Sequence, residues 1–138
     1  MIILSTILVF LLTISIIVIF HEYGHYIAAR ICGIKVLQFS VGFGKKIASF
    51  KFRNSETEFK ICALPLGGYV KMLDENEGKV SESDKKFAFN NQPLYKRAFI
   101  VANGPIFNFI LAIFFYFLIL YIGSPGLKPV VYDVVENS

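Results

Sequence analysis

Apolar positions in this chain gather into two long blocks, with short alternating runs of apolar and polar residues between them. Residues 1–20 hold no charged side chain, and residues 98–127 hold none either. About 20 apolar residues in a helix cross the roughly 30 Å hydrocarbon core of a bilayer, so each block is long enough to span a membrane. The pattern therefore predicts a membrane protein with two transmembrane helices.

The limits of these helices follow from residues that start or stop a helix. The first helix is expected to end at Gly33, since glycine commonly follows the last helical turn. A cleaved signal peptide is the alternative, but the block lacks a basic start and a small-residue cleavage site. The second block is expected to follow an interfacial helix at 94–102, start near Pro105 and run to Ile122.

The middle of the chain is expected to form β structure, because apolar and polar side chains alternate there with a period of two. Three strands and a short additional piece are expected, at 37–41, 47–53, 57–63 and 69–72. We interpret them as an antiparallel meander with turns at 42–44 and 53–56, in which Pro65 ends the third strand. A solvated, charged loop follows at 74–86.

The predicted fold class is membrane α+β, with a membrane-associated sheet between two helices. We expect a first transmembrane helix, a β region with its loop, and an interfacial segment with a second transmembrane helix, at 1–33, 34–97 and 98–123. The role of the sheet stays open. Its edge could capture an extended substrate, or the sheet could cap the helix ends at the membrane interface.

Charge is distributed unevenly along the chain, whose formal net charge is +4. All but one of the 14 Lys and Arg residues lie within residues 30–97. The positive-inside rule then places this region in the cytoplasm and both chain ends outside, and the basic excess suits contact with anionic lipid. The basic residues are scattered rather than clustered, which argues against binding to nucleic acid. Cys32 and Cys62 lack metal-type spacing and are expected to be small buried side chains.

The sequence His21-Glu22-Tyr23-Gly24-His25 is an HExxH motif at the end of the first apolar block. Two histidines four residues apart on a helix differ by only about 40° in direction, so both imidazoles can bind one zinc ion. Glu22 can then act as general base toward the attacking water. Ionisable residues at membrane depth are costly and indicate function. The motif predicts an intramembrane zinc hydrolase.

The motif leaves the zinc site incomplete, because a catalytic zinc ion normally has three protein ligands. The chain contains no third histidine, and its carboxylates lie in stretches that look exposed or beyond the membrane. Asn108 is the other polar residue at membrane depth. It could donate to the oxyanion of a transition state, or it could form an ordinary hydrogen bond between packed helices.

Several motifs, in order along nearly the whole chain, resemble the site-2 protease family of intramembrane zinc metalloproteases. Within that family the chain resembles the N-terminal part of the bacterial regulator of sigma-E proteases. Gly104 and Asn108 fit the family's GxxxN pattern, and residues 124–138 look like the lead-in to a periplasmic PDZ region. The segments that carry the resemblance are 20–26, 42–44, 64–72, 89–91, 104–108 and 123–131.

The resemblance implies that His21 and His25 bind zinc, that Glu22 is the catalytic base, and that Gly104 and Asn108 contact the substrate or the transition state. It implies a multi-pass protein of the bacterial inner membrane, with its active site toward the cytoplasm and with the N-terminus and residue 138 outside. The implied reaction is peptide-bond hydrolysis within the bilayer. The implied substrates are single-pass membrane proteins, either anti-sigma factors in the envelope stress response or remnants of signal peptides.

The chain departs from the family pattern in one respect. The family's third zinc ligand is an aspartate in a Leu-Asp-Gly motif on a later membrane helix, and the pair Leu73-Asp74 is followed by Glu75 in a charged loop. We therefore expect the chain to be an N-terminal fragment whose missing C-terminal half supplies the aspartate. The alternative is a non-catalytic membrane remnant or substrate-binding scaffold.

Overall fold

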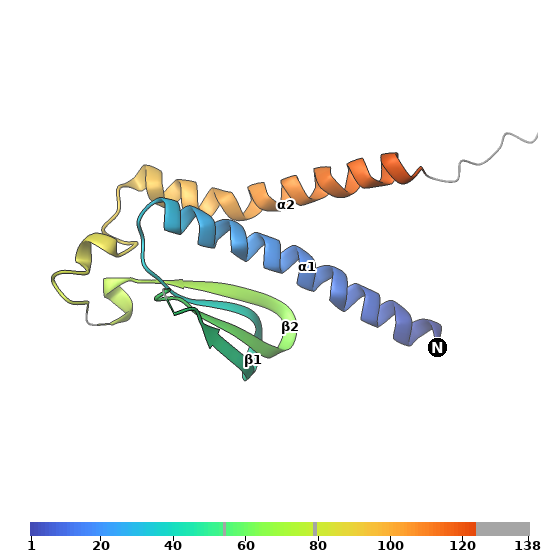
Figure 1. Ribbon diagram of the computed structural model, residues 1–138, viewed down its shortest axis with the longest axis horizontal. Helices are drawn as coiled ribbons and strands as arrows, with labels where there is room; N and C mark the ends of the chain where they lie inside the picture. The colour runs from blue at the N-terminus through green and yellow to red at the C-terminus, as the bar shows by residue number, and fades with distance from the viewer. Residues whose placement is uncertain (54, 79, 124–138) are drawn as a thin grey trace, which may run out of the picture.

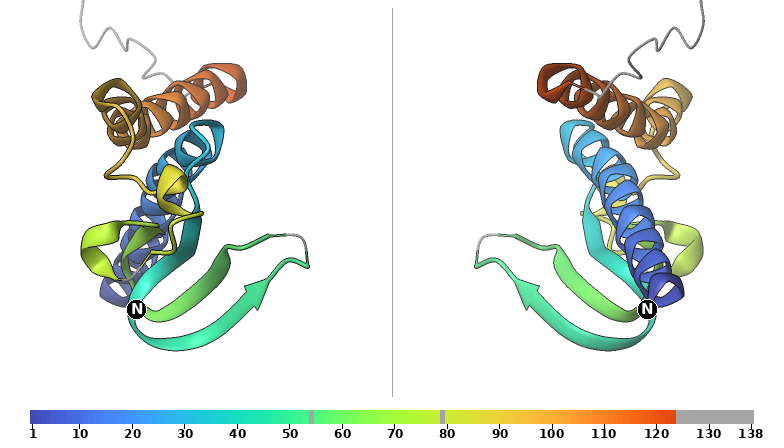
Figure 2. Two further views of the ribbon diagram at one scale, coloured as in Figure 1. Left: turned by 90° about the vertical axis from the view of Figure 1, so that its left-hand side faces the viewer. Right: turned by 90° about the vertical axis from the view of Figure 1, so that its right-hand side faces the viewer.

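The computed structural model describes residues 1–53, 55–78 and 80–123. The expected PDZ-like segment at 124–138 lies outside the described residues. The elements, in chain order, are α1 (Ile2–Ile31), β1 (Val36–Lys51), β2 (Glu58–Met72), the short 3₁₀ turns η1 (Glu75–Glu77) and η2 (Lys85–Phe87), and α2 (Leu94–Ile122). Helix α1 lies between α2 and the curved sheet (Figures 1 and 2).

Both α1 and α2 are long and apolar enough to cross a membrane. Helix α1 ends as the sequence predicts, with Cys32 as its C-cap and Gly33 next at a φ of 78°, a value that favours glycine. The expected break in the second block is wrong, because residues 94–102 and the membrane helix form one continuous helix around Pro105. Proline removes a single backbone donor, and a membrane helix tolerates this loss where neighbouring groups compensate.

The expected three-stranded meander is also wrong, because the sheet has two long antiparallel strands, β1 and β2. Gly42 and Gly44 have φ values of 86° and 84°, so β1 bends at 42–44 without ending. Pro65 lies between the paired residues Leu64 and Gly68, at an irregularity of the register where proline is tolerated. The curvature that results is visible in Figure 2.

Bending brings distant parts of the two strands together. Phe39 lies opposite Val70 and also opposite Phe59 in the register. Phe59 packs against the rings of Tyr26 on α1 and of Phe39, with centroids 5.7 and 5.6 Å apart. This aromatic cluster fixes the sheet to the C-terminal half of α1, the half that carries the HExxH motif.

The described part of the charged loop contacts Lys35, which follows the end of α1. The Leu73 amide donates to the Lys35 carbonyl at 2.8 Å, and the Lys35 amide donates to the Phe87 carbonyl at 3.1 Å. The Lys35 ammonium forms an ion pair with Asp84 at 2.9 Å. This hydrogen bond from Lys35 holds the pKa of Asp84 below its ordinary value. Near this loop, Ile34, Val36 and Ile100 are buried in one small core.

Candidate metal centre

His21 and His25 lie one turn apart on α1 and direct the same ring nitrogen toward each other. Their Nε2 atoms are 3.2 Å apart, and their rings meet edge to face at 86°. Two nitrogens bound to one tetrahedral zinc ion at about 2.05 Å lie about 3.3 Å apart. The observed separation therefore fits two adjacent ligands of one zinc ion.

Each histidine has a partner on α2 at its other ring nitrogen. His25 Nδ1 lies 2.8 Å from the Ile100 carbonyl oxygen. A carbonyl can only accept, so Nδ1 of His25 carries the proton and its Nε2 has a free lone pair in the neutral ring. Histidine ligands of metals are commonly oriented by this kind of second bond. His21 Nδ1 lies 3.2 Å from the side-chain amide of Asn108.

The backbone of α2 passes directly over the two imidazoles at Gly104. A Cβ atom added there would lie 2.5 Å from His25 Nε2 and 2.8 Å from His21 Cε1. In the same contact, Gly24 of α1 faces the carbonyl of Asn103, the residue before Gly104, and a Cβ atom at Gly24 would overlap it. Glycine at both places permits the close helix approach, as small residues do in membrane helix pairs.

Glu22 lies on the side of α1 that faces the sheet. A Cβ atom at Gly68 of β2 would lie 3.1 Å from Glu22 Cγ and 2.7 Å from the Ser40 carbonyl oxygen. The Ser15 hydroxyl, lower on α1, donates to the Pro65 carbonyl oxygen at 3.1 Å. The second half of β2 therefore runs beside the acidic residue of the motif, held close by a glycine and by one hydrogen bond.

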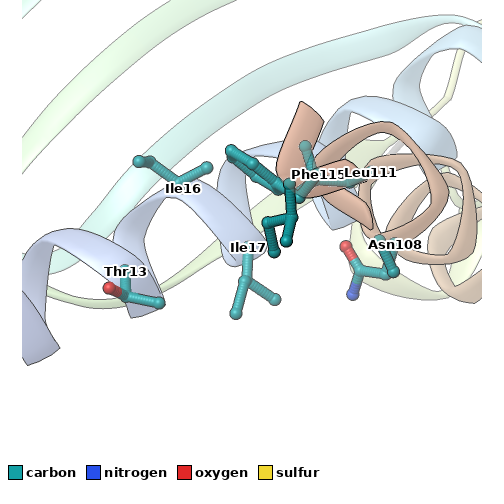
Figure 3. A pocket seen from close by; sticks show the side chains of 8 residues that line it. Thr13, Ile16, Ile17, Asn108, Leu111 and Phe115 are labelled. Atoms are coloured by element: carbon teal, nitrogen blue, oxygen red, sulfur yellow. The ribbon is translucent and has the colours of Figure 1, made fainter. Parts of the chain in front are cut away.

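A cavity of about 510 Å³ opens where α1 and α2 diverge. Figure 3 shows Asn108 projecting from α2 at one end and Thr13 projecting from α1 at the other. Its remaining lining is apolar, from Ile16, Ile17, Leu111, Ala112, Phe115 and Ile119. A second hollow of about 410 Å³ adjoins His21 and shares Asn108 and Ala112 with the first. Asn108 thus lies between the imidazole pair and the space between the helices.

Comparison with known proteins gives the family. The model of peptidase family M50 matches residues 9–137. The chain belongs to peptidase family M50. The match confirms the family resemblance that the motifs carry.

Relatives in several bacteria share nearly half of their aligned residues with this M50 chain. A protein named as a zinc metalloprotease in Vibrio cholerae is 47% identical over 129 residues. The regulators of sigma-E protease RseP of Salmonella typhimurium and Escherichia coli are each 45% identical. Each alignment covers 94% of this chain and 28% of the relative, so the chain spans less than a third of their length. The name of the Vibrio cholerae relative gives zinc as the metal of that protein.

The described residues of this M50 member do not bring three metal-binding side chains of the His, Cys, Asp or Glu type together. Of the sequence-predicted residues, His21, His25, Gly104 and Asn108 meet at one place, and Glu22 lies next to His21 on the side of α1 that faces the sheet. Sequence reasoning missed the Ile100 carbonyl, since a backbone acceptor has no side-chain signature. It also missed the close approach of Gly68 to Glu22. Cys62 is buried as expected, whereas Cys32 is only partly buried.

Proposed function

We propose that this chain forms the zinc-binding half of an intramembrane metalloprotease that hydrolyses a peptide bond within the bilayer. His21 and His25 are the zinc ligands, and Glu22 is the general base. The observation that supports this proposal most directly is the 3.2 Å separation of the two Nε2 atoms beside Glu22, in a helix apolar enough to span a membrane.

Zinc would polarise the scissile carbonyl and acidify the attacking water when bound between His21 and His25. The chain's own residues handle the protons and the oxygen. Glu22 accepts a proton from the attacking water and returns it to the leaving nitrogen, as a general base that then acts as an acid. The Asn108 amide donates to the developing oxyanion, while Gly104 lets the α2 backbone lie against the two imidazoles.

The proposed substrate is a single-pass membrane protein, such as an anti-sigma factor or a signal-peptide remnant, within the inner membrane. A helical substrate buries its scissile carbonyl in its own hydrogen bond and must be unwound before cleavage. The second half of β2 runs beside Glu22 and offers a strand edge that can hold an extended peptide by strand addition. The positive-inside rule places this sheet, and with it the active site, toward the cytoplasm.

The third zinc ligand in this proposal is an aspartate on a later membrane helix, outside the described residues. Extending the nucleotide sequence past codon 138 checks this directly. A reading frame that continues to a membrane helix with Leu-Asp-Gly completes the site. A frame without any such helix favours the second candidate function, a membrane scaffold that binds substrates without cleaving them. The absence of a third donor among the described residues is the observation behind that candidate.

The decisive test of catalysis is Glu22→Gln in the protein expressed from the complete reading frame. We expect cleavage of a single-pass reporter substrate to be lost while zinc stays bound, because the amide keeps the shape of the side chain and cannot accept a proton. Glu82→Gln, at an exposed loop position, is the matched control and should cleave normally. Cleavage by the Glu22 variant at the normal rate would exclude Glu22 as the base.

A further inference from the structure

We propose that Asn108 is a positioning residue whose amide selects the tautomer of His21, and that zinc binding is coupled to a half-turn of this amide. With zinc bound, the amide oxygen accepts the Nδ1 proton of His21. Without zinc, the amide nitrogen donates to Nδ1. This inference rests on the proposed zinc role of His21 and goes beyond it by naming what controls the ligand.

The first observation is the constraint at His25. Because its Nδ1 proton is committed to the Ile100 carbonyl at 2.8 Å, its Nε2 presents a lone pair to His21. His21 Nε2 lies only 3.2 Å away. Two lone pairs at this distance repel, so something positive must lie between the two nitrogens. A proton on His21 Nε2 serves in the absence of metal, and zinc replaces that proton.

The second observation is the contact at the other side of the His21 ring. A neutral imidazole carries one proton, so a proton on Nε2 leaves Nδ1 as an acceptor, and zinc on Nε2 requires the proton on Nδ1. The group 3.2 Å from Nδ1 is the side-chain amide of Asn108, which can donate or accept after rotation by 180°. Leu or Ala could do neither, and a carbonyl or carboxylate could only accept.

The third observation is the other end of the same amide. With Nδ2 toward His21, the buried Oδ1 atom has no hydrogen-bond partner among the described residues. After the half-turn, Nδ2 takes that place beside the cavity between the helices. The orientation required by zinc therefore also directs a free donor toward the space available to substrate. The two Asn108 orientations are close in cost, because each satisfies His21 and leaves one end of the amide open.

The balance of protons is simple. His21 is neutral in both states. When zinc binds, the ring loses its proton from Nε2 and gains one at Nδ1 by exchange with water, so it releases no proton overall. Without the amide, the Nδ1 proton that zinc binding requires on His21 has no acceptor, so zinc affinity falls. Removal of a second-sphere partner of this kind typically weakens metal binding about 10- to 100-fold.

The test is a zinc titration of the chain in detergent micelles, followed by ¹⁵N NMR of labelled histidine. The chain contains only two histidines, so the imidazole signals are few. We expect His21 to change from the Nε2–H to the Nδ1–H tautomer as zinc binds. Asn108→Leu should bind zinc about 10- to 100-fold more weakly. Asn108→Asp, which accepts from Nδ1–H, should bind at least as tightly as the wild type.

Asn103→Leu is the matched control, because this buried asparagine on the same helix donates to the Phe99 carbonyl at 2.8 Å instead of to a histidine. Its zinc affinity should stay normal. Equal weakening by both leucine variants, or unchanged binding in Asn108→Leu, would overturn the proposal, as would an Nδ1–H tautomer before zinc is added. Failure of the proposed protease function is a separate result, visible as cleavage that survives Glu22→Gln.

Discussion

The closest contact between the two helices at the histidine pair gives the sharpest prediction, for Gly104→Ala. The new methyl carbon would lie 2.5 Å from His25 Nε2, 2.6 Å from His25 Cε1 and 2.8 Å from His21 Cε1. Ordinary contacts between such atoms are about 3.5 Å, so α2 or the imidazoles must move by roughly 1 Å. The substitution therefore acts on the two proposed zinc ligands rather than on the surface of the helix.

The cost can be estimated from the way the rings are held. His25 cannot easily rotate away, since its Nδ1 is bonded to the Ile100 carbonyl on the same helix that carries the methyl group. Overpacking of this kind costs about 1–3 kcal/mol. If the strain is relieved by displacing the imidazoles from their 3.2 Å separation, zinc binding bears the cost, and affinity should fall about 5- to 150-fold.

The assay is the zinc titration in micelles, with thermal unfolding of the metal-free protein measured in parallel. Gly78→Ala is the control, because a Cβ atom at Gly78 meets nothing within 4 Å. We expect the control to bind zinc normally and Gly104→Ala to bind weakly. Normal affinity together with normal stability in Gly104→Ala would show that α2 does not approach the histidines as closely as described, and the reasoning would fail.

Two further predictions concern the sheet and its loop. Thr57 is fully buried, and its hydroxyl donates to the Val36 carbonyl at 2.7 Å. Thr57→Val should therefore lower the free energy of unfolding by about 1 kcal/mol and speed amide exchange in the sheet about fivefold. The control Thr6→Val, at an exposed position, should leave amide exchange in the sheet unchanged. Lys35 lowers the pKa of Asp84 in the folded protein. The ion pair therefore stabilises the loop fully at pH values above the unfolded-state pKa of Asp84, near 3.9. That stabilisation is lost as the pH falls through the lower pKa of the folded state. Protection of the Lys35 amide should therefore drop on acidification below about pH 4, and Asp84→Asn should abolish that dependence; an unchanged pH profile in the variant would contradict it.

The sequence predicted the two helices well because their signal is strong and local. A long stretch without charge readily forms an apolar helix, and a glycine after the last apolar turn is a common helix end, which Gly33 confirms with its φ of 78°. The errors arose where one residue type has two meanings. Pro65 can end a strand or occupy an irregularity within it, and glycines at 42–44 can close a turn or bend a continuous strand. Only long-range pairing decides between these meanings.

The candidate site likewise has one part that the sequence predicts and one part that only long-range contacts reveal. The relation of His21 to His25 follows from helix geometry, so the five residues of the motif suffice to predict it. The partners of their second nitrogens come from α2, about 75 residues or more away. Asn108 was noticeable as a polar side chain in an apolar block. Its two sequence-based interpretations, a donor to the oxyanion and a hydrogen bond between helices, both remain in the proposed roles. The Ile100 carbonyl could be found only once the crossing of the helices was known.

The way α2 crosses α1 explains why α2 contacts the two histidines and does not itself supply a side-chain ligand to the proposed metal. Ile100, Gly104 and Asn108 follow one another at intervals of four, the same interval that separates His21 from His25, so one face of α2 matches one face of α1 turn by turn. In that match, Gly104 brings the α2 backbone against the ring pair, and a carbonyl and an amide reach the two Nδ1 atoms. At Gly104 the α2 backbone lies beside the Nε2 and Cε1 atoms of the rings and leaves no room there for a side chain. In the proposed metal site, a third ligand must therefore approach the Nε2 pair from an element other than α2.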